Sequence, residues 1–157
     1  MVIEVAIPGY KTLQFNYLVL DYNGTLAVDG ALLPGVKEAL KGLAQRLEIH
    51  VLTADTFGKA RSGVEDIPCE LSILPVDNQD TGKLEYVKRL GAEHTVCIGN
   101  GRNDRLMLKE AALGIAVILK EGAAMETLIA ANVVCTSILS AFELLTNPLR
   151  LTATLRS

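Results

Sequence analysis

The sequence predicts an α/β protein built on a doubly wound parallel sheet with helices on both faces. Apolar, strand-like runs alternate with helix-like segments from about residue 16 to residue 146, which is the pattern of a parallel sheet with crossover helices. Of the 157 residues, 50% are hydrophobic and only 4% are aromatic, as expected for buried strands covered by Ala- and Leu-rich helices. This length suits one compact unit, so we expect a single domain over residues 1–157.

The predicted elements follow one another in a regular order. Strands are expected at residues 16–21, 48–53, 69–74, 95–99, 114–118 and 132–135. Helices are expected at residues 35–46, 57–65, 80–90, 103–112, 122–130 and 137–146. Pro34 is typical of a helix start, and Gly91 after two basic residues is typical of a helix stop.

The ends of the chain and one short loop carry signals of their own. Residues 2–7 form another β-prone run that Pro8-Gly9 ends, and we expect it to be an edge strand of the sheet. Asp29-Gly30 predicts a hairpin turn and therefore a small exposed flap over 26–33, a surface suited to self-association. Pro148 is expected to end the last helix, and the tail after it is left without an assignment.

Composition excludes several classes of function. The net charge is −3 with Lys and Arg scattered, so no basic surface for nucleic acid is expected. Neither a signal peptide nor a stretch long enough to span a membrane is present, and we expect a soluble, cytoplasmic protein. The three cysteines lack metal-type spacing and are interpreted as reduced core residues. His50 and His94 are interpreted as surface or capping residues, because neither has a partner at ligand spacing.

The most informative motif is Asp21-Tyr22-Asn23-Gly24-Thr25, at the end of an apolar run. A strand that ends in Asp places a carboxylate at the C-terminal edge of the sheet, where open α/β sheets bind ligands. Asp21 suits a nucleophile that accepts a phosphoryl group. Gly24 lets the backbone approach a phosphate, and Thr25 can donate from the turn. A capped turn at a strand end explains these residues about as well.

Two further polar positions follow other predicted elements. Thr53 and Ala54 end the second strand, where a hydroxyl and backbone N–H groups can hold phosphate oxygens. Capping of the next helix by Thr53 and Asp55 is the alternative. Lys83, near the start of a helix, can neutralise a phosphate and the nucleophile as a point charge. A solvated surface lysine is the alternative there.

The segment Gly99-Asn100-Gly101-Arg102-Asn103-Asp104 is the most specific of these pieces. Its glycines allow a tight turn after a strand, and its polar residues open a helix. Asn103 or Asp104 could instead serve only to cap that helix.

These four pieces, in this order and at strand ends, resemble the four motifs of the haloacid dehalogenase (HAD) superfamily of phosphoaspartyl enzymes. The stretch from Leu108 to Val117 closely resembles the segment after the fourth motif in P-type ATPase phosphorylation domains. The resemblance runs from Leu18 to Leu145. It is greatest to the small soluble P-type ATPase-like members, which lack a cap and a transmembrane domain.

The resemblance implies a HAD-type Rossmann-like sheet without a cap domain, and a phosphatase acting through an aspartyl-phosphate. Asp21 then becomes the nucleophile, with catalytic roles also for Asn23 and Lys83. The phosphoryl group would be bound by Thr53, Ala54, Lys83 and Gly24. Mg²⁺ is the implied cofactor, and its implied ligands are Asp21, Asn23, Asn100 and Asp104.

Two positions depart from the family pattern. Asn23 stands where ordinary HAD phosphatases carry an Asp that acts as general acid and base, a function worth about 10²–10⁴-fold in rate. Asn100 stands where a Mg²⁺-binding Asp is usual, and an amide supplies one negative charge less. P-type ATPases also lack the first Asp, which is associated with a longer-lived phosphoenzyme.

Two functions follow from these departures. The first is a slow, Mg²⁺-dependent phosphohydrolase or phosphotransferase acting on a small phosphorylated substrate or a phosphoprotein. The second is a catalytically reduced HAD domain that binds a phosphorylated ligand or a partner as a regulatory module. The retained Asp21, Thr53, Lys83 and Asp104 favour the first. We expect no nucleic-acid or membrane partner, and a homo-oligomer is possible.

Overall fold

A computed structural model describes residues 2–55 and 58–157. Its centre is a six-stranded sheet with the order β10-β9-β8-β3-β6-β7, in which each neighbouring pair is parallel. The strands of this sheet are β3 (Tyr17–Asp21), β6 (Glu48–Thr53), β7 (Glu70–Ile73), β8 (Thr95–Gly99), β9 (Leu113–Val117) and β10 (Val133–Cys135). The predicted doubly wound α/β fold is confirmed.

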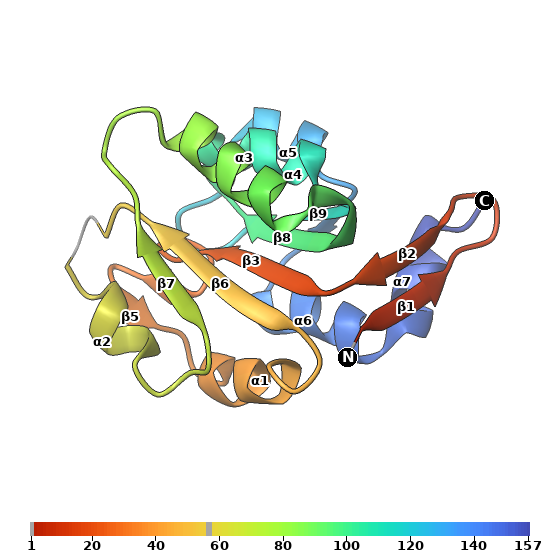
Figure 1. Cartoon of the computed structure of the whole chain (residues 1–157), viewed down its shortest axis with the longest axis horizontal. Helices are drawn as coiled ribbons and strands as arrows, with labels where there is room; N and C mark the ends of the chain where they lie inside the picture. The colour runs from red at the N-terminus through yellow and green to blue at the C-terminus, as the bar shows by residue number, and fades with distance from the viewer. Residues whose placement is uncertain (1, 56–57) are drawn as a thin grey trace.

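Helices cover both faces of the sheet (Figure 1). The α-helices are α1 (Val36–Leu43), α2 (Ala60–Val64), α3 (Gln79–Leu90), α4 (Arg105–Glu110), α5 (Met125–Ala130), α6 (Ile138–Thr146) and α7 (Pro148–Leu155). Two short 3-10 helices, η1 (Ala92–His94) and η2 (Arg102–Asp104), flank β8. All six predicted helices have a counterpart, although residue 57, the expected start of one, lies outside the described residues.

The alternation of side chains along β3 divides the core in two. Leu18 and Leu20 belong to the larger hydrophobic cluster, which includes residues of α1 and α6. Val19 points to the opposite face and belongs to a second cluster, with residues of α3 and α4. A strand buried on both faces reads as a continuous apolar run, which is why β3, β8 and β9 are evident in the sequence.

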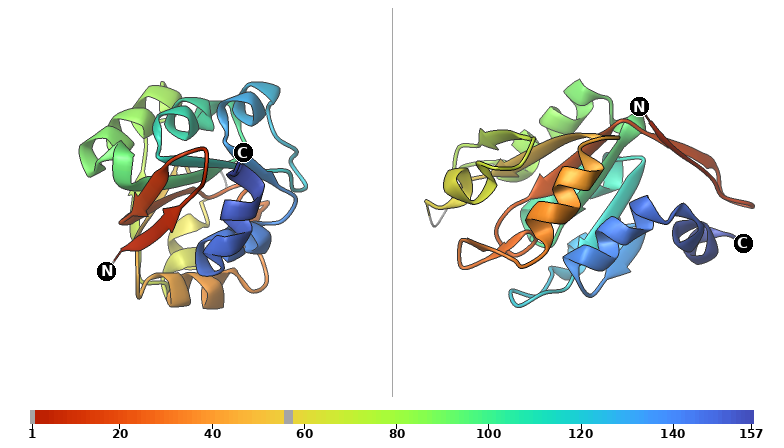
Figure 2. Two further views of the ribbon diagram at one scale, coloured as in Figure 1. Left: turned by 90° about the vertical axis from the view of Figure 1, so that its right-hand side faces the viewer. Right: turned by 90° about the horizontal axis from the view of Figure 1, so that it is seen from below.

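Residues 2–7 do not form an edge strand, and that prediction is wrong. β1 (Ile3–Ala6) pairs antiparallel with β2 (Thr12–Phe15) in a separate hairpin, whereas β10 and β7 form the edges of the main sheet. The chain reverses at Pro8-Gly9, where Gly9 has a φ of 75°. β1 therefore pairs with the strand that follows directly, β2, and not with the main sheet. The hairpin projects from the body and lies beside α7 (Figures 1 and 2).

Pro148 begins a helix instead of ending one. α6 stops at Thr146, and Pro148 is the first residue of α7. Proline is tolerated there because the N–H that it lacks has no partner in the first turn of a helix. The unassigned tail is therefore mostly helical, and its Leu151 is fully buried.

The hairpin at Asp29-Gly30 is present, but it is not an exposed flap. β4 (Ala27–Val28) and β5 (Ala31–Leu32) pair antiparallel across this turn, in which both residues have positive φ. Leu26 and Ala27 are fully buried. The Tyr22 hydroxyl donates to the Gly30 carbonyl at 3.0 Å. Because the hairpin packs on the core, it offers less surface for self-association than the sequence suggested.

His50 is a buried residue of β6, which corrects its assignment to the surface or to a cap. Cys97 is buried, and Cys69 and Cys135 are half-buried, with all three thiols free. No helix in the described part of the chain has the length and apolar character needed to cross a membrane.

Candidate active site

Three neighbouring strands bring the sequence motifs to one edge of the sheet. Asp21 is the last residue of β3, Thr53 the last of β6 and Gly99 the last of β8. Because β8, β3 and β6 are adjacent and parallel, these residues meet at the carboxyl edge. A cavity of about 190 Å³ opens there, lined by Asp21, Asn23, Thr53, Ala54, Gln79, Asn100, Gly101, Asn103 and Glu121. Five of the eight site residues named from the sequence line this cavity.

Lys83 is completely buried beneath the cavity and joins the first motif to the fourth. Its Nζ lies 2.9 Å from Asp21 Oδ1 and 2.7 Å from Asp104 Oδ1. It also donates to Asn103 Oδ1 at 3.2 Å. The three donors of a lysine ammonium are therefore all used, and Lys83 is not a surface lysine.

Burial and charge shift the acid–base behaviour of this group. Burial acts to lower the pKa of Lys83, but the nearby Asp104 and Asp21 carboxylates outweigh it and raise this pKa overall. Burial raises the pKa of Asp21 to about 7, and Asp104 adds to the rise, while Lys83 and Thr25 oppose it. When Asp21 is ionised, the two carboxylates and the ammonium carry one net negative charge, which favours a bound cation.

Asp104 shapes the loop of the fourth motif as well as holding Lys83. Its Oδ2 accepts hydrogen bonds from the backbone N–H groups of Asn100 and Gly101, both at 3.0 Å. Gly99 makes room for it, because a Cβ there would lie 2.4 Å from Asp104 Cγ. Asp104 is fully buried and both its oxygens have partners. Asp104 therefore both holds this loop and orients Lys83.

Asn100 and Asp21 present oxygens to the same place. The Thr25 hydroxyl lies 3.3 Å from both Asp21 Oδ2 and Asn100 Oδ1. The amide of Asn100 is oriented by a bond from its Nδ2 to the Gly122 carbonyl at 3.0 Å. Gly24, with a φ of 81°, allows this approach, because a Cβ there would lie 2.6 Å from Asn100 Nδ2. Carboxylate and amide oxygens are the donors that Mg²⁺ prefers.

Asn23 carries an unsatisfied polar atom. Among the described residues its Oδ1 is the one buried side-chain oxygen or nitrogen without a hydrogen-bond partner. Leaving such an atom unpaired typically costs about 1–3 kcal/mol. Native proteins have few buried polar atoms without a partner, and such an atom often has a functional role.

Thr53 and Asp55 both take part in a turn that the sequence left open. The Asp55 N–H donates to Thr53 Oγ1 at 2.9 Å, and Asp55 Oδ1 accepts from the N–H of Ala60, the first residue of α2. Asp55 therefore satisfies the first N–H of α2, although Lys59 is the N-cap residue. Because Thr53 Oγ1 accepts in this turn, its hydroxyl proton is available to donate into the cavity.

Four lining residues were not named as site residues from the sequence: Gln79, Gly101, Asn103 and Glu121. Gln79 lies one turn before Lys83 on α3, and its Oε1 accepts from Asn103 Nδ2 at 2.8 Å. The i, i+4 spacing of Gln79 and Lys83 is the signal that could have identified it. Asn103 was considered only as a helix cap, although it holds Lys83. Glu121 lies in a loop, and no sequence pattern marks it.

Solved structures with a similar fold include hydrolases of the HAD superfamily. The chain has the fold of the HAD superfamily. Over 89% of its length it resembles 3-deoxy-D-manno-octulosonate 8-phosphate phosphatase from Moraxella catarrhalis, which was solved with magnesium, phosphate and KDO. The TM-score is 0.70, the identity 19% and the coverage of that chain 92%. A putative HAD superfamily (subfamily III A) hydrolase from Legionella pneumophila matches with a TM-score of 0.68 and 16% identity, covering 89% of this chain and 86% of that one.

Sequence comparison identifies the family more narrowly. The chain belongs to the same family as the uncharacterized protein MJ0073 of Methanocaldococcus jannaschii, with 41% identity over 92 residues that cover 53% of this chain and 99% of that protein. MJ0072 of the same organism is 54% identical over 39 residues, covering 25% of this chain and 89% of its own. No model of a known protein family matches the sequence.

The fold also matches part of a membrane transporter. A zinc-transporting PIB-type ATPase aligns with 78% of this chain and 20% of its own length, with a TM-score of 0.62 and 22% identity. The expected likeness to P-type ATPase domains therefore holds at the level of the fold.

Proposed function

We propose that the protein is a Mg²⁺-dependent phosphohydrolase or phosphotransferase that forms an aspartyl-phosphate on Asp21. The observation that carries this proposal is the position of Lys83, buried between Asp21 and Asp104 and bonded to two residues that line the cavity, Asp21 and Asn103. A buried ammonium at this place can offset the negative charge of a dianionic phosphoryl group that binds beside a carboxylate nucleophile.

The chain supplies a nucleophile and donors for the phosphoryl oxygens. Asp21 would attack phosphorus, forming an acyl phosphate as the bond to the leaving-group oxygen breaks. Lys83 would offset the charge of both groups, and the Thr53 hydroxyl would donate to a phosphoryl oxygen. Water would then attack the aspartyl-phosphate, which releases phosphate and regenerates Asp21. Preorganised donors of this kind supply the largest share of many rate enhancements.

The oxygens around Asp21 fit a magnesium ion. Asp21, Asn100 and the main-chain carbonyl of Asn23 would hold it, and Asp104 would act by orienting Lys83. When bound, Mg²⁺ would offset the crowded negative charge of nucleophile and phosphate. Magnesium and cobalt appear in the names of two structural neighbours, the phosphatases from Moraxella catarrhalis and Haemophilus influenzae, which supports a metal here.

Asn23 would make the reaction slow for substrates with poor leaving groups. An amide cannot give a proton to a departing alkoxide or take one from the attacking water. General acid–base assistance is worth about 10²–10⁴-fold, so acyl and aryl phosphates are the expected good substrates. The cavity of about 190 Å³ is smaller than the roughly 300–1,000 Å³ of typical ligand pockets. It would hold the phosphoryl group, with the leaving group outside.

The alternative is a reduced domain that binds a phosphorylated ligand without turning it over. Asn23 and Asn100 favour it, since each replaces a carboxylate of the usual site. The two functions share Lys83 and Thr53 as phosphate-binding groups. They differ in whether Asp21 becomes covalently modified.

Hydrolysis of acetyl phosphate and p-nitrophenyl phosphate in Mg²⁺ tests the proposal. We expect measurable turnover from the wild type and none from Asp21→Asn, with circular dichroism showing that the variant is folded. Equal rates from the two proteins would place the reaction elsewhere. Phosphate binding without turnover in the wild type would support the alternative.

A further inference from the structure

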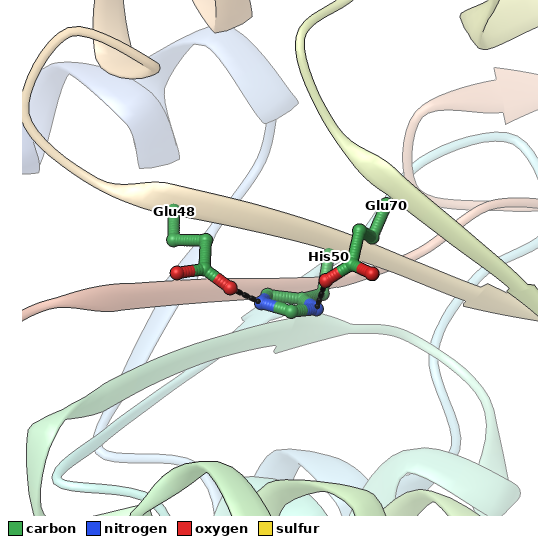
Figure 3. Close-up of side chains that lie close together, drawn as sticks. All are labelled: Glu48, His50 and Glu70. Atoms are coloured by element: carbon green, nitrogen blue, oxygen red, sulfur yellow. Dashed lines mark hydrogen bonds and ion pairs between the residues drawn. The ribbon is translucent and has the colours of Figure 1, made fainter.

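A second cluster of potential ligands lies at the opposite end of β6 from the candidate active site (Figure 3). Glu48 and His50 are two residues apart on β6, so they share one face of the strand. His50 is register-paired with Glu70 on β7, which brings a second carboxylate to the same imidazole. Along β6, Glu48 lies five steps, or roughly 17 Å, from Thr53 of the cavity, and His50 lies three steps, or roughly 10 Å, from it.

The imidazole is buried and both its nitrogens face oxygens. His50 is 1% exposed. Its Nε2 lies 2.8 Å from Glu48 Oε1, and its Nδ1 lies 2.7 Å from Tyr86 Oη and 3.5 Å from Glu70 Oε2. The hydroxyl of Tyr86, on α3, can accept the Nδ1–H. That bond would direct the Nε2 lone pair toward Glu48, which is the second-shell arrangement typical of a metal-binding histidine.

The two carboxylates are exposed and lack a basic partner. The side chains of Glu48 and Glu70 are 58% and 71% exposed. Within the described residues, neither is within ion-pair distance of a lysine or arginine, and His50 is the one basic group beside them. Both line a cavity of about 570 Å³ that opens at this edge of the sheet. Arg46 lines the same cavity without an ion pair to either glutamate, and His50 does not line it. An ion that enters this cavity would therefore reach the two carboxylates first and have room for water ligands.

We propose that Glu48, His50 and Glu70 form a binding site for a divalent transition metal ion of the zinc type. One ligand atom from each residue lies within 4.8 Å of the others, and the two flexible glutamates can close the remaining gap. The ion would bind the Nε2 lone pair beside Glu48, and the exposed Glu70 carboxylate would turn from the Nδ1 side of the ring to reach it. An imidazole with two carboxylates suits Zn²⁺, whereas Mg²⁺ prefers oxygen ligands alone.

Such an ion would connect the edge strand β7 to β6. β7 is the last strand of the sheet; its two end residues are exposed and its two middle residues are half-buried. A ligand that binds only the folded state raises its stability, so Zn²⁺ should raise the melting temperature. This site is separate from the Asp21 centre, and the proposal does not depend on the function of that centre.

Calorimetric titration with Zn²⁺ tests the site in full-length protein that carries Asp21→Asn, so that the other metal centre is weakened. We expect one equivalent of Zn²⁺ to bind. Glu48→Gln/Glu70→Gln should weaken binding by more than about 100-fold, and Tyr86→Phe by about 10–100-fold as a second-shell change. The matched control Glu65→Gln/Glu85→Gln removes two exposed glutamates elsewhere and should bind as the parent does.

Co²⁺ spectroscopy distinguishes this site from the cysteines. Nitrogen and oxygen ligands predict weak d–d bands without thiolate charge transfer. Unchanged Zn²⁺ affinity in the Glu48/Glu70 double variant, or a thiolate charge-transfer band in the parent, would overturn the proposal. The double variant replaces only exposed side chains, so its folding can be verified independently by its melting temperature without metal.

Discussion

The two ends of β6 hold charge in opposite ways. At the Thr53 end, Asp21 and Asp104 are buried with the Lys83 ammonium between them. At the Glu48 end, the imidazole of His50 is buried while the two carboxylates reach solvent. Burying charged groups is costly unless they are paired and hydrogen-bonded, so the first end is rigid and fully connected. The second end leaves its carboxylates free to move toward an ion.

Removing the cation at the first end should have the largest effect. Lys83→Met would leave Asp21 and Asp104 buried without a countercharge, which typically costs about 3–5 kcal/mol of stability, and should abolish turnover. Lys88→Met, on the exposed face of the same helix, should change stability by less than about 0.5 kcal/mol. Urea unfolding measures the free energy of unfolding of the two variants.

The loss in Lys83→Met should depend on pH with a definite sign. Burial raises the pKa of Asp21 to about 7 while Lys83 opposes the rise, so loss of the ammonium should raise this pKa further in the folded state. Stability is then retained at low pH, where Asp21 is protonated, and lost as the pH rises. A loss that is equal at pH 5 and pH 8 would show that the Lys83 charge is not what stabilises this end.

The identity of residue 23 should control the choice of leaving group. We expect the wild type to cleave acetyl or p-nitrophenyl phosphate far faster than a sugar phosphate, because a departing alkoxide needs a proton. Asn23→Asp should narrow that gap, by up to about 10²–10⁴-fold in relative kcat/KM. Equal wild-type rates on both substrate types would mean that another residue supplies the proton.

Magnesium affinity should rise with pH, since protons compete for Asp21. The pKa of Asp21 is raised to about 7 by burial and then by Asp104. Below that pH, the Mg²⁺ concentration for half-maximal activity should increase by up to about tenfold per pH unit, which is the limit for one competing proton. Above pH 8 it should level off. Magnesium titrations of activity from pH 5.5 to 8.5 measure this, and a flat profile would contradict the shift.

The sequence predicted the site at the carboxyl edge of the sheet much better than the His50 cluster at the opposite end of β6. Asp21, Thr53 and Gly99 end apolar strands, and parallel strands bring their carboxyl ends to one edge, so their meeting follows from order alone. The position of Lys83 between Asp21 and Asp104 depends on the path of α3, which the spacing of residues along the sequence does not reveal. Glu121 and Asn103 depend on loop geometry, and they were not assigned to the cavity.

His50 shows a different limit of sequence analysis. Its partners are an i−2 neighbour, a residue on the next strand and a tyrosine from a helix. Only the register of β6 against β7 brings Glu70 beside it. The same limit applies to β1, whose pairing depended on where the chain reverses. Patterns within a strand predicted the elements, whereas pairing between strands had to be observed.

The central claim is that Asp21 accepts a phosphoryl group, and mass spectrometry tests it most directly. The protein is incubated with acetyl phosphate and Mg²⁺, quenched in acid and digested. A phosphate adduct on the peptide that contains Asp21, which hydroxylamine removes and which Asp21→Asn does not form, is the predicted result. A wild-type protein that stays unmodified, or that carries its adduct on another residue, would contradict the account.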